Sequence, residues 1–438
     1  MRQVRWASWT VAATVVLLVG APQVGRADVT SDKAAAIVVW PIVNVGGPAA
    51  SDTLIQLSNT GTKQVEAACF YVNANSHCTN SGAVCTRGAD CCAAGSCGQC
   101  IAGWQETDFR IHLTAGQPIG WEASDGLLDF CAPNEISGEP CIPIDGSTRF
   151  GPKVNPLVQN SPLQSNAGTR IPPVPEVPFI GELKCIAVDP DTGVPLSALN
   201  TGPVPPNNVL DPNTLKGEAT LESVSADRLD VGKYNAIGIR ALDNPNTDGQ
   251  DNVLTLLNGH DPQTNDPLVG EYEGCPGVII LNHFFDFAVN PVTELAEFPL
   301  LERRVFTWPV FVPCTENFLQ QTAGTAVAQY LVYNEFEQRF STSNTIKCFG
   351  ATGLSNIDTP DPSRSVFSVG VAGTLTGQTR ITPQGSGLLA VALEYHSATA
   401  GTVAPVLAGA TALATGRSGD FNVHYQGQRA TADLITMP

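Results

Sequence analysis

Six cysteines lie within residues 78–100 of this 438-residue chain, and they form its densest set of side chains that could do chemistry. They are Cys78, Cys85, Cys91, Cys92, Cys97 and Cys100. Cysteines this close together either bind zinc or pair as disulfides. Cys97 and Cys100 have the spacing of half a zinc site, but no second such pair and no well-spaced histidine completes it. We therefore expect disulfides among these six, in a stapled loop insertion too short to bury its own core.

The chain has 13 cysteines in all, and because this number is odd, one is expected to be free. Cys131 and Cys141 flank a loop with two prolines and a glycine, and we expect them to form one disulfide. Cys314 and Cys348 both lie in the C-terminal part, and we expect them to form another. Sequence alone does not choose among the pairings that the remaining cysteines allow.

Oxygen ligands concentrate in a glycine-containing loop at residues 242–252, with the sequence LDNPNTDGQDN. The candidate metal ligands are Asp243, Asn246, Asp248 and Asp251. Carboxylate and amide oxygens on a turning backbone suit Ca²⁺. However, Thr255 stands where an EF-hand loop would place a bidentate glutamate. A turn closed by its own Asx side chains explains the same residues, so calcium and a plain turn both stay open, and no other cofactor is indicated.

Sequence motifs of familiar catalytic sites do not occur in this chain. The stretch around Ser386 fails the register of a G-x-S-x-G nucleophile elbow, and there is no H-E-x-x-H, P-loop or G-x-G-x-x-G. His283 and Asp286 are three residues apart in a predicted strand, so they should point to opposite faces and not share a site. Carboxylate pairs for glycoside hydrolysis meet only in space, and the sequence leaves that possibility open.

Residues 1–27 have the pattern of a secretory signal peptide. Arg2 and Arg5 precede an apolar run at residues 10–19, and small residues near Ala27 predict cleavage there. The run is too short to span a bilayer, and no later stretch reaches about 18 consecutive apolar residues. The sequence thus predicts a secreted protein, extracellular or periplasmic, without membrane insertion. In that oxidising environment most cysteines should be paired.

Acidic residues outnumber basic ones by 41 to 23, which gives a net charge of −18. A polyanion repels phosphates and anionic lipid, so neither nucleic acid nor a membrane surface is expected as a partner. The 33 prolines and 41 glycines, with only 15% charged residues, favour strands and loops over helices.

Alternating or β-branched apolar runs separated by turn residues predict strands along most of the chain. Long loops rich in Pro, Gly and Asn are expected at residues 132–178 and 189–216. The predicted fold class is all-β, with two Ig-like β-sandwich domains. We place the first at residues 28–300, including the cysteine-stapled insertion, and the second at 301–438. A single large sandwich is the alternative.

Two tryptophan-proline pairs suggest an internal repeat. Trp40-Pro41 and Trp308-Pro309 each lie in an apolar β-branched run, and each is followed downstream by a Cys-Phe pair. Proline cannot donate to a strand ladder, so each strand should lie at a sheet edge or cross between sheets at that point. We expect both tryptophans to be buried, in equivalent places of two similar sandwiches.

The stretches DTLIQLSNTGTKQVEAACFYVNANSHC, WQETDF, NHFFD, LVYNEFEQRFS and GTLTGQTRI together resemble a family of uncharacterised secreted bacterial proteins. The resemblance spans most of residues 35–437 and implies a β-rich exported protein, with no site residues. The cysteine order in residues 78–100 also resembles an inhibitor cystine knot. That resemblance implies the pairs Cys78–Cys92, Cys85–Cys97 and Cys91–Cys100.

These patterns favour a disulfide-stabilised, non-enzymatic extracellular protein of structural, adhesive or surface-binding type. Its partner would be a surface polymer or another extracellular protein. The alternative is a secreted hydrolase that acts on a polymer through a carboxylate pair. Buried acids converging near aromatic side chains would favour the hydrolase.

The two interpretations of residues 242–252 predict different responses to calcium. If Asp243, Asp248 and Asp251 bind Ca²⁺, the melting temperature should rise with the logarithm of free calcium above the dissociation constant. Differential scanning calorimetry in chelator and in millimolar calcium measures this shift. Identical melting curves would leave only the self-closed turn.

Overall fold

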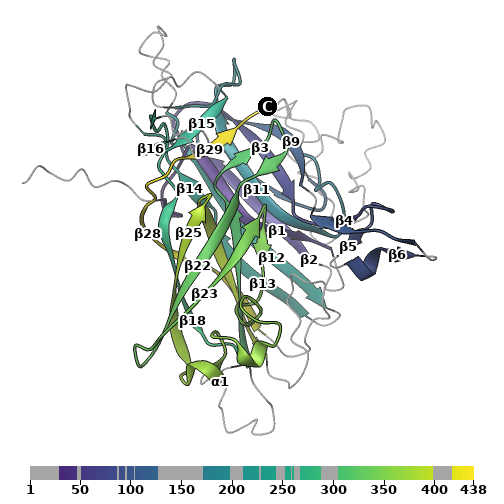
Figure 1. Cartoon of the computed structure of the whole chain (residues 1–438). Coiled ribbons are helices and arrows are strands. Elements are labelled where there is room, and N and C mark those ends of the chain that lie inside the picture. The colour runs from purple at the N-terminus through teal and green to yellow at the C-terminus, as the bar shows by residue number, and fades with distance from the viewer. Residues whose placement is uncertain are drawn as a thin grey trace, which may run out of the picture.

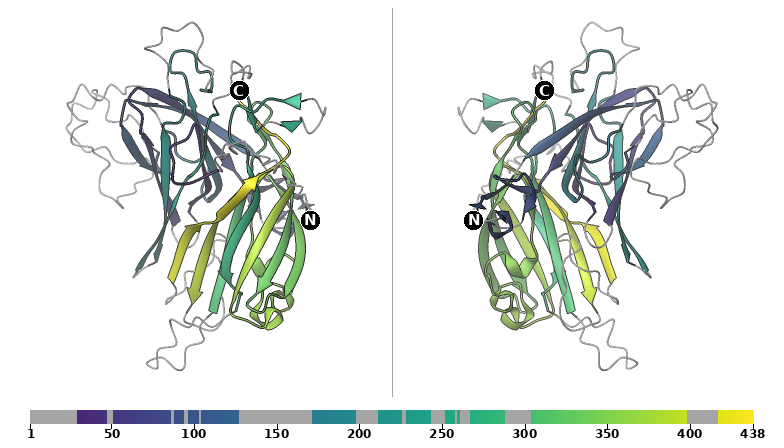
Figure 2. Two further views of the ribbon diagram at one scale, coloured as in Figure 1. Left: turned by 90° about the vertical axis from the view of Figure 1, so that its left-hand side faces the viewer. Right: turned by 90° about the vertical axis from the view of Figure 1, so that its right-hand side faces the viewer.

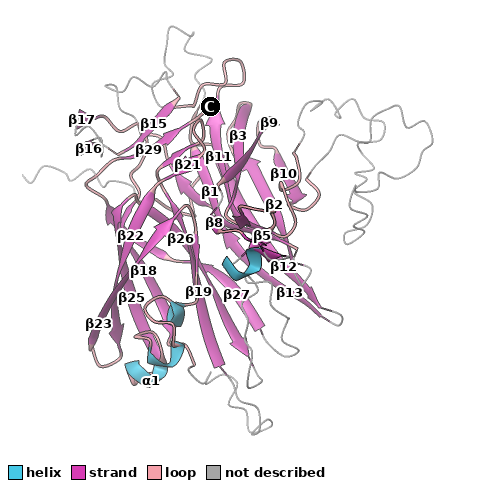
Figure 3. Ribbon diagram, turned by 45° about the vertical axis from the view of Figure 1, so that its right-hand side comes forward, coloured by secondary structure: helices cyan, strands magenta, loops and turns pink. Residues whose placement is uncertain are grey.

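The computed structural model describes residues 29–46, 51–85, 88–93, 96–102, 104–126, 171–197, 211–225, 228–242, 252–257, 259–260, 267–287, 304–397 and 417–438. Within them, regular structure is almost entirely β-strand (Figure 1, Figure 3). The helical pieces are the single turn α1 (Val369–Ala372) and the 3-10 turns η1 (Gly88–Cys91), η4 (Leu354–Asn356) and η5 (Pro362–Arg364). The predicted all-β sandwich fold is confirmed.

The first sandwich consists of two antiparallel sheets. Sheet A has the strand order β14 (Ile237–Ile239), β1 (Ile37–Val45), β11 (Phe179–Val188), β3 (Val65–Asn73) and β9 (Gln105–Leu113). Sheet B has the order β10 (Pro118–Glu122), β2 (Ser51–Asn59), β12 (Leu215–Ser225) and β13 (Arg228–Asn235).

The second sandwich again pairs a five-stranded with a four-stranded antiparallel sheet, and lies beside the first (Figure 2). Sheet C has the order β28 (His424–Gln428), β18 (Pro276–Phe284), β25 (Thr376–Gly385), β22 (Thr325–Asn334) and β23 (Arg339–Lys347). Sheet D has the order β24 (Gly350–Ala351), β19 (Arg304–Pro313), β26 (Leu388–Ser397) and β27 (Arg417–Asn422).

The remaining strands form small sheets. A junction sheet has the order β15 (Val253–Leu256), β29 (Asp433–Thr436), β20 (Glu316–Asn317) and β21 (Thr322–Ala323), and β29 is parallel to β20. A short hairpin joins β16 (Gly259–His260) to β17 (Pro267–Leu268). The cysteine-rich insertion contains β4 (Ser76–Cys78), β5 (Val84–Cys85), β6 (Cys92–Ala93), β7 (Ser96–Cys97) and β8 (Cys100–Ala102).

The two sandwiches repeat one topology. In chain order, the strands β1, β2, β3, β9, β10, β11, β12, β13 and β14 belong to sheets A, B, A, A, B, A, B, B and A. The strands β18, β19, β22, β23, β24, β25, β26, β27 and β28 occupy sheets C and D in the same sequence. Matching strands also hold matching places within their sheets. The chain therefore contains two copies of one nine-stranded plan.

This match corrects two details of the sequence analysis. Because β18 belongs to sheet C, the second sandwich begins at or before Pro276, not at residue 301. The two tryptophans are also not equivalent, since β1 corresponds to β18 and β19 corresponds to β2. Trp40 faces sheet B inside the first sandwich, where it contacts Gly217. Trp308 packs on the other side of sheet D, with the core of the first sandwich. The shared Trp-Pro pair is a coincidence of short motifs.

Both tryptophans are buried as predicted, with exposures of 0% for Trp40 and 6% for Trp308. The prediction that each strand lies at a sheet edge is wrong, since β1 lies between β14 and β11 and β19 lies between β24 and β26. However, each proline lies at a point where its strand is paired on one side at most. Strand β14 pairs with β1 only up to Val39, and β1 has a bulge at Pro41. Strand β24 pairs with β19 only from Val310 onward, after Pro309. The missing N–H of each proline therefore breaks no ladder there.

The central strands of sheet A are covered on both faces. All nine residues of β1 are buried, and β11 is buried at every position but one. The core that fills the first sandwich continues past sheet A to Val310 and Val391 of sheet D. By contrast, buried residues of β22 alternate with residues that are exposed or half-buried, as expected for a strand in a sheet with one solvated face. The central strands of sheet A thus form an interior layer, whereas its edge strand β9 is partly exposed.

The disulfides confirm one expectation and correct others. The six clustered cysteines bond among themselves, as Cys78–Cys91, Cys85–Cys100 and Cys92–Cys97, in an insertion between β3 and β9. These pairs differ from those that the knot resemblance implied. Cys92 and Cys97 lie opposite each other across the tight β6–β7 hairpin, which takes Cys92 away from Cys78.

Outside the insertion, Cys69 pairs with Cys185 and Cys275 pairs with Cys314. The expected Cys314–Cys348 bond is wrong, and Cys348 is a free thiol. Cys314 follows β19 of sheet D, whereas Cys348 follows β23 at the edge of sheet C, so the two end on different layers. Cys131 and Cys141 lie outside the described residues.

The contact between Trp40 and Gly217 predicts an asymmetry between two glycines of sheet B. A methyl group at Gly217 would overlap the Trp40 indole, whereas at Gly120 its nearest neighbour would be 3.4 Å away. We expect Gly217→Ala to lower the free energy of unfolding by about 1–3 kcal/mol through overpacking. Urea denaturation measures this, with Gly120→Ala as the matched control. Equal effects of the two substitutions would contradict the packing described here.

Candidate functional site

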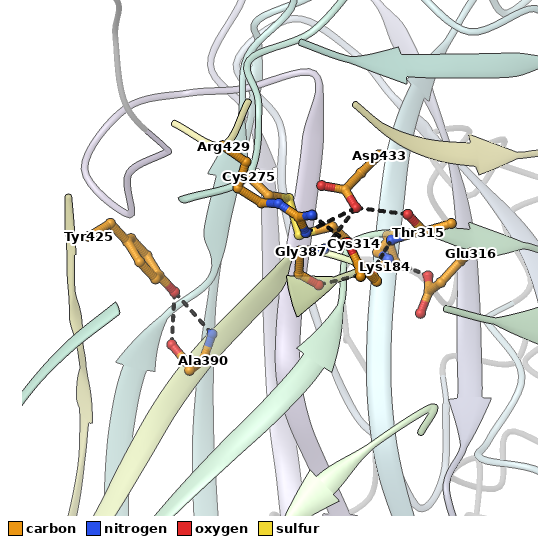
Figure 4. Close-up of a disulfide and its surroundings, with 12 residues drawn as sticks. Lys184, Cys275, Cys314, Thr315, Glu316, Gly387, Ala390, Tyr425, Arg429 and Asp433 are labelled. Carbon is orange, nitrogen blue, oxygen red and sulfur yellow. Dashed lines mark hydrogen bonds and ion pairs between the residues drawn. A yellow bond between two sulfur atoms is a disulfide. The ribbon is translucent and has the colours of Figure 1, made fainter. Parts of the chain in front are cut away.

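Several buried charged side chains lie together at the junction of the two sandwiches, and Figure 4 shows Lys184, Glu316, Arg429 and Asp433 among them. Strand β20 begins two residues after Cys314, whose disulfide to Cys275 links the segments that precede β18 and follow β19. Because β20 pairs with β29, the same small sheet carries both Glu316 and Asp433. This strand pairing places two acidic side chains at the junction. There, Glu316 pairs with Lys184, and Asp433 pairs with Arg429.

Lys184 and Glu316 form a fully buried ion pair across this junction. Lys184 comes from β11 of sheet A, and each of the two side chains is 1% exposed or less. Glu182 lies two residues before Lys184, on the same face of the strand. Its Oε1 is 3.7 Å from Lys184 Nζ, and neither of its carboxyl oxygens makes a hydrogen bond among the described residues.

The strand register brings a third acid, Glu106, to this face. Across β11, β3 and β9, Glu182 lies opposite Val72, and Val72 lies opposite Glu106. The neighbouring row carries Lys184 and Phe70. We call Glu106, Glu182, Lys184 and Glu316 the junction cluster.

Aromatic rings line the junction cluster. Phe70 stacks on Phe318 with a centroid distance of 4.1 Å, and Trp104 stacks on the same ring at 5.8 Å. Lys184 Nζ lies 5.8 Å from the Phe318 centroid. The charges therefore sit in an apolar, low-dielectric setting, in which their mutual interactions are strong.

Burial and neighbouring charges set the protonation of the cluster. Burial, followed by repulsion from Glu316, raises the pKa of Glu182 well above its usual range, so its carboxyl is held neutral. Burial acts to lower the pKa of Lys184, but the attraction of Glu182 and Glu316 outweighs it and leaves that pKa raised. Burial, then Asp108 and Glu316, raise the pKa of Glu106 to about 7. The core of the cluster is thus an ion pair beside a protonated acid.

A second polar group lies beside the Cys275–Cys314 disulfide (Figure 4). Asp433 Oδ1 accepts hydrogen bonds from Thr315 Oγ1 and from the backbone N–H of Gly387, both at 2.8 Å, and Arg429 Nη1 is 3.5 Å away. Burial raises the pKa of Asp433 to about 6, although Arg429 opposes the shift. These bonds tie β29 to the segments beside the disulfide.

His283 and Asp286 take separate partners, as expected. The His283 ring bonds to the Thr379 hydroxyl at 2.8 Å. Asp286 accepts hydrogen bonds from the backbone N–H groups of Thr307 and Ser355. Both residues are buried, and each fixes local chain geometry.

The structure brings together residues that the sequence analysis did not single out. Glu182 and Lys184 interrupt an otherwise apolar strand, FIGELKCIAV, and that interruption was the available signal. Cys348 lies close enough for Glu316 and Glu182 to contribute, after burial, to raising the pKa of its thiol. The predicted calcium ligands Asp243, Asn246, Asp248 and Asp251 lie outside the described residues.

Comparisons with known proteins add no relative. No protein-family model matches the chain, and no curated protein matches it significantly. Within the described residues, no helix is long and apolar enough to cross a bilayer.

The raised pKa of Glu106 predicts a pH dependence of stability. Folding favours its neutral form, so its contribution to stability is present at low pH. That contribution is lost as the pH rises from 4.5, the ordinary pKa of a glutamate, to about 7, the raised pKa of Glu106. We expect Glu106→Gln to flatten the fall in unfolding free energy over this range. Urea denaturation across the range tests it, with exposed Glu337→Gln as the control. Parallel pH profiles of the wild type and Glu106→Gln would refute the assignment.

Proposed function

We propose that this chain is a secreted, non-enzymatic β-sandwich protein that acts structurally or as an adhesin, binding a surface polymer or another extracellular protein. The observation that carries the proposal is the complete burial of three of the four members of the junction cluster. Lys184, Glu182 and Glu316 pair with one another, and their side chains are 1% exposed or less. A polymer cannot reach groups so deeply buried, so their chemistry serves to couple the two sandwiches.

Several links support a rigid two-sandwich unit. Besides the ion pair and the Cys275–Cys314 bond, the edge strands β13 and β27 meet through reciprocal hydrogen bonds. The Asn235 backbone N–H donates to Asn422 Oδ1, and Asn422 Nδ2 donates to the Asn235 carbonyl. Disulfides in such number are typical of exported proteins, which supports secretion. Cleavage of a signal peptide after Ala27 remains a prediction.

An exposed aromatic residue marks a place where binding can occur. Phe336 lies in the turn between β22 and β23 and is 72% exposed. Glu335, beside it, accepts hydrogen bonds from the backbone N–H and the hydroxyl of Thr376. This anchors the turn next to half-exposed Leu375. Exposed rings on fixed turns suit contact with sugars and with apolar side chains.

The hydrolase alternative has one specific observation in its favour. Glu106 is only half-buried, and its pKa of about 7 suits a general acid. Its Oε2 and the Trp104 indole N–H have no hydrogen-bond partner among the described residues. In this second candidate function, Glu106 would protonate a leaving group at the rim of the junction.

One experiment separates the two functions. Purified protein is incubated with insoluble polysaccharides and cell-wall fractions, and both its depletion from solution and the release of soluble products are measured. We expect depletion without product release, and a several-fold weaker depletion for Phe336→Ala. Leu319→Ala, which removes another exposed apolar side chain, is the matched control. Product release that Glu106→Gln abolishes would instead establish the hydrolase.

A further inference from the structure

We propose that Lys184 and Glu316 join in an intramolecular amide bond between their side chains, with Glu182 as the proton-transfer group. This modification would link the first sandwich covalently to the junction sheet. It goes beyond the proposed function and does not depend on it, because it concerns how the chain is cross-linked and not what it binds.

The first requirement, proximity, is met by the fold. Lys184 Nζ donates a hydrogen bond to Glu316 Oε2 although 132 positions separate the two residues in the chain. The lysine is fixed on a central strand of sheet A, and Glu316 is fixed by the pairing of β20 with β29. Holding an amine and a carboxyl together in this way gives the reaction a high effective molarity.

The second requirement is exclusion of water. Lys184, Glu182 and Glu316 are each 1% exposed, and the stacked rings of Phe70 and Phe318 border the lysine. The attraction of Glu182 and Glu316 keeps Lys184 charged in the resting state, so the reaction begins with the transfer of one proton from Nζ to the Glu316 carboxylate along their hydrogen bond. Without solvent nearby, the amide is also protected from hydrolysis.

The third requirement is a group that moves protons between the nitrogen and the leaving oxygen. Glu182 Oε1 lies 3.7 Å from Nζ, and its carboxyl oxygens have no hydrogen-bond partner among the described residues. Burial and the nearby Glu316 raise the pKa of Glu182, so it enters the reaction protonated. Both Glu316 and Lys184 act on the pKa of Glu182, so this acid lies beside the two groups that react.

The atoms balance as a condensation. The neutral Lys184 Nζ attacks Cδ of the protonated Glu316 carboxyl, and an N–C bond forms. Glu182 gives its proton to the departing hydroxyl, and the C–O bond breaks with release of one water. Glu182 then takes the excess proton from the nitrogen and returns to its starting state. No oxidant, metal or second substrate is needed.

Peptide mapping of the secreted full chain tests the proposal. The protein is denatured, reduced, alkylated and digested with trypsin, and the peptides are analysed by mass spectrometry. We expect a branched peptide that joins the segments around Lys184 and Glu316 and lacks the mass of one water. Trypsin should fail to cleave after Lys184, because its amine is blocked.

Two variants give the test its controls. Glu182→Gln should leave the segments unlinked and restore cleavage after Lys184, while an intact Cys275–Cys314 bond in the non-reduced digest shows that the variant has folded. Glu106→Gln should retain the link. A wild-type chain with a free Lys184 would overturn the proposal and leave an ion pair only. A link that persists in Glu182→Gln would overturn the role of Glu182.

Discussion

The three central strands of sheet A turn no face to water, and the rest of the molecule is built around that constraint. An antiparallel sheet usually keeps one solvated face, but β1, β3 and β11 are buried on both. Every polar group on these strands must then find a partner inside the protein, or remain at a cost. Glu182 and Lys184 break the apolar pattern, and the cation finds its partner in Glu316 on the junction sheet.

The pairing also explains why the two sandwiches meet where they do. A buried ion pair adds little net stability, but a charge left alone there is strongly destabilising. The arrangement that brings β20 against sheet A gives Lys184 its partner Glu316. The junction cluster thus selects one arrangement of the two sandwiches, while apolar contacts between sheets A and D supply the area. Apolar contacts alone are non-directional and do not fix the position of one sheet relative to the other.

The sequence predicts local structure well and long-range partners poorly. Alternation in residues 325–334 identifies β22, and the apolar run that contains Trp40 identifies β1, because side-chain period follows directly from strand geometry. Sheet membership is different. The strand at residues 276–284 looks the same whether it ends one sandwich or begins the next, so the domain boundary was misplaced. The topological repeat was likewise hidden, since the Trp-Pro pairs pointed to strands that do not correspond.

The candidate site likewise combines a local signal that the sequence reveals with a long-range contact that it does not. The charges within FIGELKCIAV could be seen as exceptions in an apolar strand, but no local pattern connects them to Glu316, which is brought near only by the β20–β29 pairing. Cysteine pairing depends on space in the same way. The clustered six were predictable as a closed set, whereas the partner of Cys314 depends on where β18 enters sheet C.

The disulfides differ in the solvent exposure of their sulfur atoms, so a reductant should reach them in a definite order. Cys69 and Cys185 are completely buried on neighbouring strands of sheet A, so a small thiol can reach their sulfurs only after the sandwich opens. Cys92 and Cys97 are exposed in a two-stranded hairpin. A mild reductant would open this outer bond first and loosen the insertion while the sandwich keeps its shape. Among the described disulfides, Cys92–Cys97 is therefore more open to exchange with an external thiol than Cys69–Cys185.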